Sequence, residues 1–331
     1  MSWLGAVQAQ DYHGAKWGLA LRTQGATSAS IDQLFNDGRI LRTHVLRPTW
    51  HFVLPRDIRW LLALTSPRVH AANAAYYRKF ELDGPVFARS QHLIVGALER
   101  GQHCTRAELA AALSAGGLPM TGQRLAYALM RAELDAVICS GPLRGRQFTY
   151  ALLDERVPLT PALDREAALT ELALRYFTSH GPASVHDFAW WSGLTVKEAR
   201  AGLHTVESRL GHESSGHTDW WLAARPAVPA GGPVTIDLLP NYDEHIVAYK
   251  DHEPTLDPGL PARKPGDDTL AAHLIVRDGL VTGGWRRTLK ARRVEIRAKL
   301  LVALRREERA MMQAAADAYG GFLGLTAILT G

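Results

Sequence analysis

The order of hydrophobic and polar positions repeats three times along the first two thirds of the chain, with starts at Ser28, Ser90 and Asp164. In each repeat, apolar residues recur first at helical spacing and then in short runs rich in β-branched and aromatic residues, which are typical of strands. Each repeat predicts a helix, a turn or short helix, a further helix and a pair of strands. The starts are about 70 residues apart, which favours an array of similar modules.

Local signals place the elements of each repeat. The first has a helix near Ile31–Phe35, a turn at Asp37-Gly38 and two β-prone segments, THVL and TWHFVL. In the second, Thr105 and Glu108 predict a capping box at a helix start, and two later strands enclose the tip GPLRGR. The third ends in two strands about a Gly/Ser tip, within SRLGHESSGHTDWWLA. Helices followed by a β-hairpin in this order are typical of a winged helix, the helix-turn-helix variant with a β wing.

From Val234 onward the pattern becomes β-rich, with an Asp-Gly hairpin signal at 277–280, a proline-rich loop at 254–265 and a closing helix at 304–322. The segment 224–233, ARPAVPAGGP, is the expected linker. The predicted fold class is therefore α+β, with tandem winged-helix modules followed by a β-rich domain like a partial barrel. The expected boundaries are 1–84, 85–158 and 159–230 for the three modules and 231–331 for the C-terminal domain.

Composition limits the kind of protein this can be. The chain has 331 residues, of which 47% are hydrophobic and 21% charged, as in ordinary globular proteins. No apolar run approaches the ~20 residues that a membrane-spanning helix needs, and the start MSWLGAVQAQ has no secretory signal. Cys104 and Cys139 are the only cysteines, which excludes a four-cysteine zinc site and favours a reducing compartment. The expected location is the cytoplasm, with no membrane partner.

Positive charge is concentrated at the two ends of the chain. Residues 1–100 carry 12 Lys+Arg and 7 Asp+Glu, whereas residues 101–284 carry 16 and 22. Residues 285–309 carry 10 Lys+Arg and 3 Asp+Glu. If the two basic ends meet in space, they form a face suited to a phosphate backbone, although a basic run is also what an ordinary solvated surface presents.

Two glutamines separated by one residue precede the first expected helix. Asp11 is a plausible N-cap for the helix YHGAKWGLALR, so Gln8 and Gln10 would lie in extended chain. Side chains at i and i+2 of an extended segment point the same way, so both amides could hold one water or polar ligand. The alternative is that both are ordinary surface residues.

Four segments resemble the bacterial winged-helix DNA glycosylases of the YcaQ/AlkZ-like family, in matching order over nearly the whole chain. They are LGAVQAQDY, GRILRTHVLRPTWHFVLPRDIRWLL, DLLPNYDEHIVAYKDH and GGWRRTLK. The resemblance implies tandem winged helices in a C-shaped body, and a catalytic Gln-x-Gln or Gln-x-Asp motif that Gln8 and Gln10 match. Gln-x-Gln is the branch of the azinomycin-resistance glycosylase. Family members usually carry a helix or more before this motif, so either the start is misassigned or the first module is incomplete.

The activity implied by the resemblance is a monofunctional DNA glycosylase that hydrolyses the N-glycosidic bond of N-alkylated purines, including bulky adducts or interstrand crosslinks, in base-excision repair or self-resistance. An alkylated purine is already cationic, so amide carbonyls suffice to orient water and stabilise the oxocarbenium-like sugar. A flat pH–rate profile near neutrality is expected. A loss of rate on protonation of a carboxylate would instead assign the catalytic role to Asp11. No lysine nucleophile lies in the motif, so no lyase activity is expected.

The implied partner is double-stranded DNA containing alkylated purines, bound by a monomer in association with the nucleoid. No cofactor and no metal are expected. The alternative function is a non-catalytic winged-helix DNA-binding regulator, which would have no need for the Gln-x-Gln motif.

Other residues are candidates for the same site. In TWHFV, alternation places Thr49 and His51 on one face, and the resemblance makes them pocket candidates with Asp11; a buried structural histidine is the alternative. The expected phosphate contacts are Arg42, Arg47, Arg286, Arg287 and Lys290. The last three follow a Gly-Gly pair that allows close backbone approach, although a β-bulge with solvated arginines would explain the same pattern.

Three further patterns are interpreted structurally. HESSGH spaces its histidines by five rather than four residues, so a zincin site is rejected and a turn is expected. The pairs Trp190-Trp191 and Trp220-Trp221 are expected to pack rather than to stack on bases. The acidic segment YDEHIVAYKDHE matches no metal-ligand spacing, and Asp243 is interpreted as structural, in support of the pocket.

Overall fold

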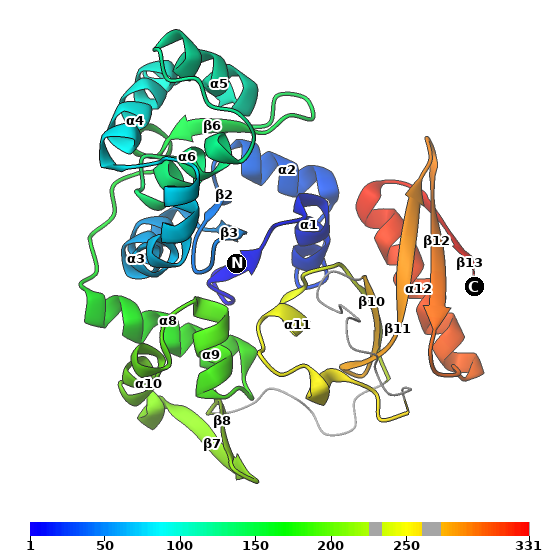
Figure 1. Cartoon of the computed structure of the whole chain (residues 1–331). Coiled ribbons are helices and arrows are strands. Elements are labelled where there is room, and N and C mark those ends of the chain that lie inside the picture. The colour runs from blue at the N-terminus through cyan, green and yellow to red at the C-terminus, as the bar shows by residue number, and fades with distance from the viewer. Residues whose placement is uncertain (225–233, 260–272, 331) are drawn as a thin grey trace. The chain divides into compact units, whose positions relative to one another are not determined.

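The computed structural model describes residues 1–224, 234–259 and 273–330, which form two compact units. Unit 1 comprises Met1–Ala6 and Gln33–Ala224, and unit 2 comprises Val7–Asp32 and Arg225–Gly331 (Figure 1). Both contain helices and strands, as the α+β prediction requires. Residues 225–233 of the expected linker and 260–265 of the proline-rich loop lie outside the described residues. The four module boundaries remain a prediction.

The second repeat folds as a winged helix within unit 1. Its strands form one antiparallel sheet in the order β4-β6-β5, and the capping box at Thr105 and Glu108 is confirmed. Leu109 and Leu113 of the second helix are fully buried in the core of this module. The elements are α4 (Gly84–Leu98), β4 (Cys104–Thr105), α5 (Arg106–Ala115), α6 (Gly122–Leu134), β5 (Ile138–Ser140), β6 (Thr149–Leu152) and the short α7 (Leu153–Arg156).

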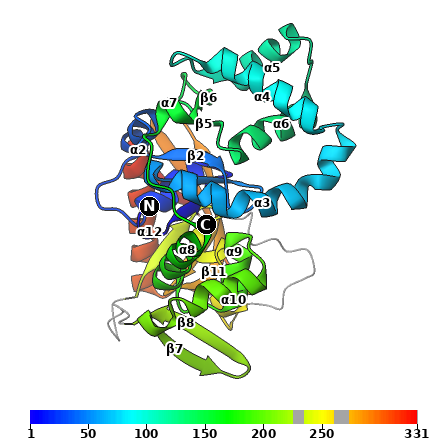
Figure 2. The same cartoon turned by 90° about the vertical axis from the view of Figure 1, so that its left-hand side faces the viewer.

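The third repeat has the same order. Ser184 with Asp187 and Thr195 with Glu198 make capping boxes at the starts of its second and third helices. Trp221 pairs with Ala183, so the base of the wing is joined to the helices. The elements are α8 (Arg165–His180), α9 (Val185–Ser192), α10 (Val196–His204), η1 (Glu207–Arg209), β7 (Leu210–Ser215) and β8 (Thr218–Ala223). Figure 2 shows β7 and β8 extending from these helices as a hairpin.

The tip of that hairpin is a turn with Gly216 at φ 62°, as predicted for the segment HESSGH. His212 contacts Asp219 at 3.2 Å. Of the tryptophans expected to pack, Trp191 is completely buried, Trp220 and Trp221 are half-buried, and Trp190 is 38% exposed.

The first repeat contains α2 (Ser28–Asn36) and the antiparallel pair β2 (Leu41–His44) and β3 (Trp50–Val53), in which Thr43 faces His51. A 25-residue helix, α3 (Pro55–Lys79), follows directly. Pro55 lies in its first turn, where a backbone N–H has no partner within the helix, so proline is tolerated there. None of the described helices is long and apolar enough to cross a membrane.

Unit 2 is built on a five-stranded sheet in the order β13-β12-β11-β10-β9, which curls as a half-barrel. Its strands are β9 (Ile236–Leu239), β10 (Leu274–Arg277), β11 (Leu280–Leu289), β12 (Arg293–Leu300) and β13 (Thr326–Thr330). Its helices are α1 (Tyr12–Ala20), α11 (Glu244–Val247), η2 (Glu253–Thr255) and α12 (Arg306–Leu323). The strand β1 (Ala6–Gln8) contains the boundary between the units.

The expected hairpin at 277–280 is present, with Asp278 and Gly279 at φ 50° and 82°, as a two-residue type I′ turn requires. The closing helix α12 is confirmed and joins β12 to β13, which pair in parallel. Gly324, at φ 69°, ends it. Figure 1 shows α12 beside β11 and β12. The core of this unit includes Trp17 of α1, whose ring lies 5.1 Å from Tyr319 and 5.2 Å from Phe322 of α12.

Candidate functional site

The glutamine motif lies at the junction of a strand and a helix. Gln8 is the last residue of β1, and Asp11 caps α1 from extended backbone, with its carboxylate accepting from the N–H groups of His13 at 3.0 Å and Gly14 at 3.1 Å. The strand at Gln8 and the cap at Asp11 agree with the prediction, whereas Gln10 lies at a bend. That the two amides point the same way remains a prediction. Gln8 is 7% exposed, whereas Gln10 is exposed.

A buried carboxylate holds the backbone of this motif. The N–H of Gln8 donates to Glu244 Oε1 at 2.6 Å, across 236 positions of sequence. Glu244 is 3% exposed and begins α11. Sequence reasoning noticed the acidic segment NYDEH but assigned Glu244 no role. The only signal was the acidic pair Asp243-Glu244, between Tyr242 and His245, and it does not say which backbone the carboxylate contacts.

Asp243, the neighbour of Glu244, anchors α11 to α1. Its carboxylate accepts from the N–H of His245 as the N-cap of α11, and it binds two nitrogens of Arg22 at 2.9 Å and 2.6 Å. Burial of the Arg22 guanidinium opposes its charge, but Asp243 outweighs this and raises the pKa of Arg22. The structural interpretation of Asp243 fits this contact set.

Two glycines allow α1 to approach this segment closely. A Cβ at Gly14 would lie 2.9 Å from Asn241 Oδ1, and a Cβ at Gly18 would lie 3.0 Å from Asp243 Oδ2. Between them, Trp17 Nε1 donates to the carbonyl of Leu238 at 2.6 Å. One face of α1 is therefore closely packed on the segment that carries Glu244.

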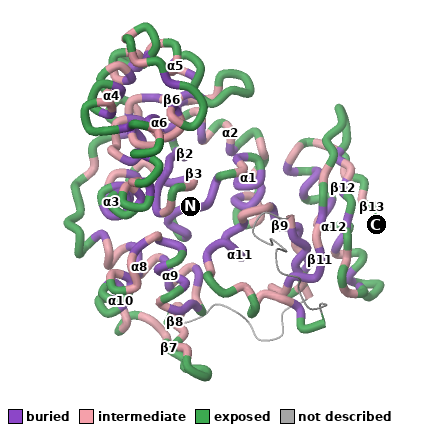
Figure 3. Tube along the Cα trace, viewed as in Figure 1, coloured by how far each residue is buried: buried purple, intermediate pink, exposed green. Residues whose placement is uncertain are grey.

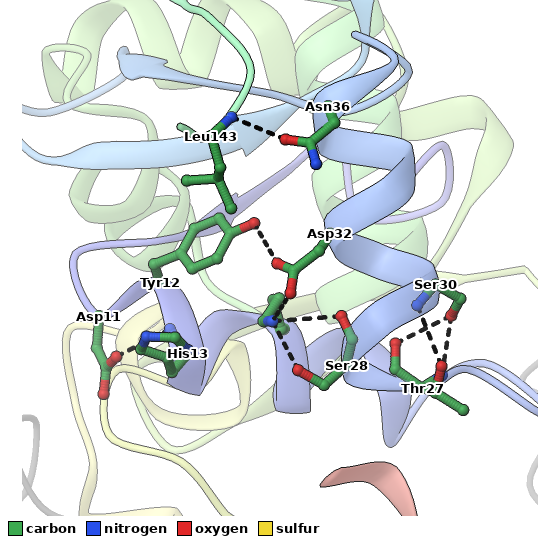
Figure 4. Close-up of polar contacts among 10 residues, drawn as sticks. Asp11, Tyr12, His13, Thr27, Ser28, Ser30, Asp32, Asn36 and Leu143 are labelled. Carbon is green, nitrogen blue, oxygen red and sulfur yellow. Dashed lines mark hydrogen bonds and ion pairs between the residues drawn. The ribbon is translucent and has the colours of Figure 1, made fainter. Parts of the chain in front are cut away.

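The opposite side of α1 is fixed by a buried lysine. Lys16 is 1% exposed, and its ammonium donates to Asp32 Oδ2 at 2.7 Å and to Ser28 Oγ at 2.7 Å. Tyr12 donates its hydroxyl to the other oxygen of Asp32 at 2.6 Å (Figure 4). These contacts join α1 to the start of α2 and engage the charge of Lys16.

A second group of polar side chains surrounds Asp11. Arg287 lies 3.9 Å from Asp11 Oδ2 and donates to the hydroxyl of Tyr319 at 2.7 Å. The N–H of Asn241 donates to His273 Nδ1 at 2.8 Å. Burial and then the charge of Arg287 lower the pKa of His273 to about 4, so this histidine is neutral near pH 7.

The hairpin of β11 and β12 carries five exposed cations on one face, which we call the basic hairpin face. They are Arg286, Lys290, Arg293, Arg297 and Lys299. Arg286 lies directly opposite Arg297, and Lys290 pairs with Arg293 through the backbone. Like charges directly opposite each other destabilise a sheet. Glu295 lies on the same face and contacts Arg293 at 2.8 Å, whereas Arg286 and Arg297 face each other. Figure 3 shows the exposed tip of this hairpin.

Arg287 points the other way, toward α12, and is only partly exposed. The preceding Gly-Gly pair serves the sheet: a Cβ at Gly283 would lie 2.5 Å from the carbonyl of Lys299. The register of β10 against β11 also shifts beside it. The alternative reading, a β-bulge, therefore describes these glycines, and the close approach is to neighbouring strands.

The other sequence candidates lie in unit 1. His51 is completely buried and its Nδ1 lies 3.0 Å from the carbonyl of Thr49. Arg42 is 9% exposed, with its guanidinium 4.2 Å from the ring centre of Trp50 and 4.9 Å from that of Phe148. Arg47 is half-buried and lies 5.2 Å from the Trp190 ring. The structure thus groups Thr49, His51 and the two arginines on the β2–β3 hairpin and its loop.

Comparisons with known proteins agree on one family. The family model described as "DNA glycosylase AlkZ-like" matches residues 1–322. Among solved structures, the chain is similar to the DNA glycosylase AlkZ of Streptomyces sahachiroi, with a TM-score of 0.77 and 19% sequence identity over 99% of this chain and 92% of that chain. A search of curated proteins found no match.

Proposed function

Because the chain belongs to the AlkZ-like DNA glycosylase family, we propose that it hydrolyses the N-glycosidic bond of N-alkylated purines, including bulky adducts or interstrand crosslinks, in double-stranded DNA. The family establishes DNA glycosylase activity, and the proposal concerns the lesion and the residues. The observation that carries it is Gln8-x-Gln10 at a strand–helix junction with Gln8 held by a buried carboxylate.

The chemistry suits neutral amides. Alkylation at N7 or N3 makes the purine a cation, so the leaving base needs no strong acid. What the protein must supply is an oriented water and partial negative charge near the developing oxocarbenium ion, and fixed carbonyl dipoles supply both. The glutamines cannot remove a proton, so intact neutral purines are poor substrates.

Monofunctional action is supported by the state of Lys16. A lyase step needs an amine that is free to reach and attack C1′ of the sugar. The side chain of Lys16, in the helix that follows the motif, is buried and bound to Asp32 and Ser28. We therefore propose that the product is an intact abasic site, formed without a cofactor.

Binding of DNA is assigned to basic residues in both units. In unit 2, Arg286 and Lys290 of the basic hairpin face are the proposed phosphate contacts. Arg287 is partly exposed and remains a candidate phosphate contact. From unit 1, Arg47 is the more exposed of the two candidates, since Arg42 is packed between aromatic rings. A damaged base costs least to unstack, which helps to select the lesion. We propose that the protein acts as a monomer in association with the nucleoid.

A base-release assay tests the proposal. The chain is incubated with duplexes carrying 7-methylguanine, 3-methyladenine, a bulky N7 adduct or a crosslink, and strand breaks at abasic sites are revealed by alkali. The proposal predicts alkali-dependent breaks for at least one alkylated purine, and no covalent adduct on borohydride treatment. Tight binding without release from any duplex would favour a non-catalytic winged-helix regulator.

A further inference from the structure

We propose that Glu244 is a positioning residue of the glutamine motif: its carboxylate fixes the backbone of Gln8, and the rate of base release depends on it. This inference rests on the proposed function and adds a residue that neither the motif nor the family description names. It assigns a role to the acidic segment NYDEH, which lies far from the motif in sequence.

The contact itself is strong. An ionised oxygen that accepts from an N–H group makes a shorter and stronger hydrogen bond than a neutral acceptor, and the distance from Gln8 N to Glu244 Oε1 is 2.6 Å. Both residues are buried, at 7% and 3% exposed. Because water has little access, loss of this carboxylate would leave the N–H of Gln8 poorly compensated.

The carboxylate is itself fixed in place. Glu244 follows Asp243, which caps α11 and is bound by two nitrogens of Arg22 from the end of α1. Gly14 and Gly18 bring α1 against the same segment, and Trp17 donates to Leu238 just before it. Glu244 therefore connects β1 to the segment 238–244, which also contacts α1, the helix that follows the motif.

Such a connection matters most when the catalytic groups are neutral. An amide has no charge to act over distance, so its effect depends on where its dipole points. A displacement of about 1 Å in a reacting group can cost about 100-fold in rate. We therefore expect loss of Glu244 to lower the rate at saturation rather than the affinity for DNA.

The test uses Glu244→Gln and Glu244→Ala in the full chain, with two readouts. Hydrogen exchange of the segment 6–11 is followed by mass spectrometry, and single-turnover base release is measured at saturating protein. Glu244→Gln keeps an acceptor oxygen without the charge, and we expect a rate about 10-fold lower; Glu244→Ala should be about 100-fold lower with faster exchange at Gln8. The dissociation constant for DNA should change less than about 2-fold in both variants.

Glu308 offers a matched control in the same unit. It is 1% exposed, and its Oε2 accepts from the N–H of Arg305 at 2.7 Å at the start of α12. Its Oε1 also accepts from the guanidinium of Arg305, at 2.9 Å and 2.8 Å. Glu308→Gln therefore changes a carboxylate of similar burial that also accepts from a backbone N–H, away from the motif. It should lower the melting temperature without changing the rate of base release.

The results separate this inference from the proposed function. A wild-type chain that releases no base counts against the proposed function, whereas unchanged exchange at Gln8 in Glu244→Ala overturns the inference whatever the activity. Wild-type rates in Glu244→Ala also overturn it. If Glu244→Ala fails to fold, Glu244→Gln decides: a rate equal to that of Glu308→Gln overturns the inference, and a rate about 10-fold lower supports it.

Discussion

At the scale of single residues, the proposed chemistry depends on side chains that stay neutral near pH 7. Gln8 and Gln10 do not titrate, and the carboxylate of Asp11 is engaged by two backbone N–H groups of α1. The place of the motif and its cap could be predicted from sequence, because an N-cap is a local signal. The contact of Gln8 with Glu244 could not, because no local pattern specifies a partner 236 positions away.

His273 provides a pH-dependent test of the surroundings of Asp11. Its pKa falls from 6.5 to about 4 in the folded chain, so the unfolded chain binds more protons between these values. The contribution of neutral His273 to the free energy of unfolding is therefore fully present above pH 6.5. It is lost as the pH falls toward 4.

We expect His273→Asn, which keeps an acceptor for the N–H of Asn241 and cannot be protonated, to flatten this part of the stability curve. The melting temperature, measured from pH 4 to 8 for both chains, should fall less steeply on acidification in the variant. Parallel curves would show that His273 does not titrate as the structure implies.

At the scale of elements, the winged-helix repeats follow local signals, and the structure shows them where those signals are strongest. Thr105 with Glu108 starts a helix as predicted, and the Asp278-Gly279 turn joins the expected strands. The packing role of Gly14 and Gly18 was not visible, since two glycines in a helix only suggest a weak helix. Their function comes from the segment that α1 packs against.

Gly18→Ala tests the close approach of α1. A Cβ at Gly18 would lie 3.0 Å from Asp243 Oδ2, so the Asp243 carboxylate, which Arg22 also binds, would have to shift. We expect the overpacking cost of about 1–3 kcal/mol to exceed the gain of about 0.5–1 kcal/mol from replacing a helical glycine. Urea unfolding should show the loss of stability, and base release should slow.

Gly96→Ala is the matched control. Gly96 lies within α4, and a Cβ there would meet no atom within 4 Å. Alanine should therefore stabilise this helix by about 0.5–1 kcal/mol and leave base release unchanged. Equal effects of the two substitutions would contradict the packing argument.

At the scale of the whole molecule, charge is distributed unevenly along the chain, and the two units divide the chain in a way that the sequence pattern does not predict. Residues 7–32, expected to belong to the first winged-helix module, group with the C-terminal sheet. Their contacts with Leu238, Asp243 and Glu244 are long-range, and hydrophobic periodicity carries no information about them. The uneven charge, by contrast, could be counted directly.

The basic hairpin face predicts a specific salt dependence. Arg286→Ala, Lys290→Ala and Arg297→Ala should each reduce the slope of log K against log salt concentration by about 1, if each side chain contacts one phosphate. Fluorescence anisotropy over a salt series measures this slope. Arg309→Ala, an exposed position on α12, is the control and should leave the slope unchanged. Slopes equal to that of wild type in all three variants would exclude this face.

The most direct test of the glutamine chemistry is the single-turnover rate of 7-methylguanine release at saturating protein, for the wild-type chain, Gln8→Ala and Gln10→Ala. We predict that each substitution lowers this rate by about 100-fold or more, with DNA affinity close to wild type. Release by either variant at the wild-type rate would contradict the assignment of the two amides as the groups that carry out hydrolysis.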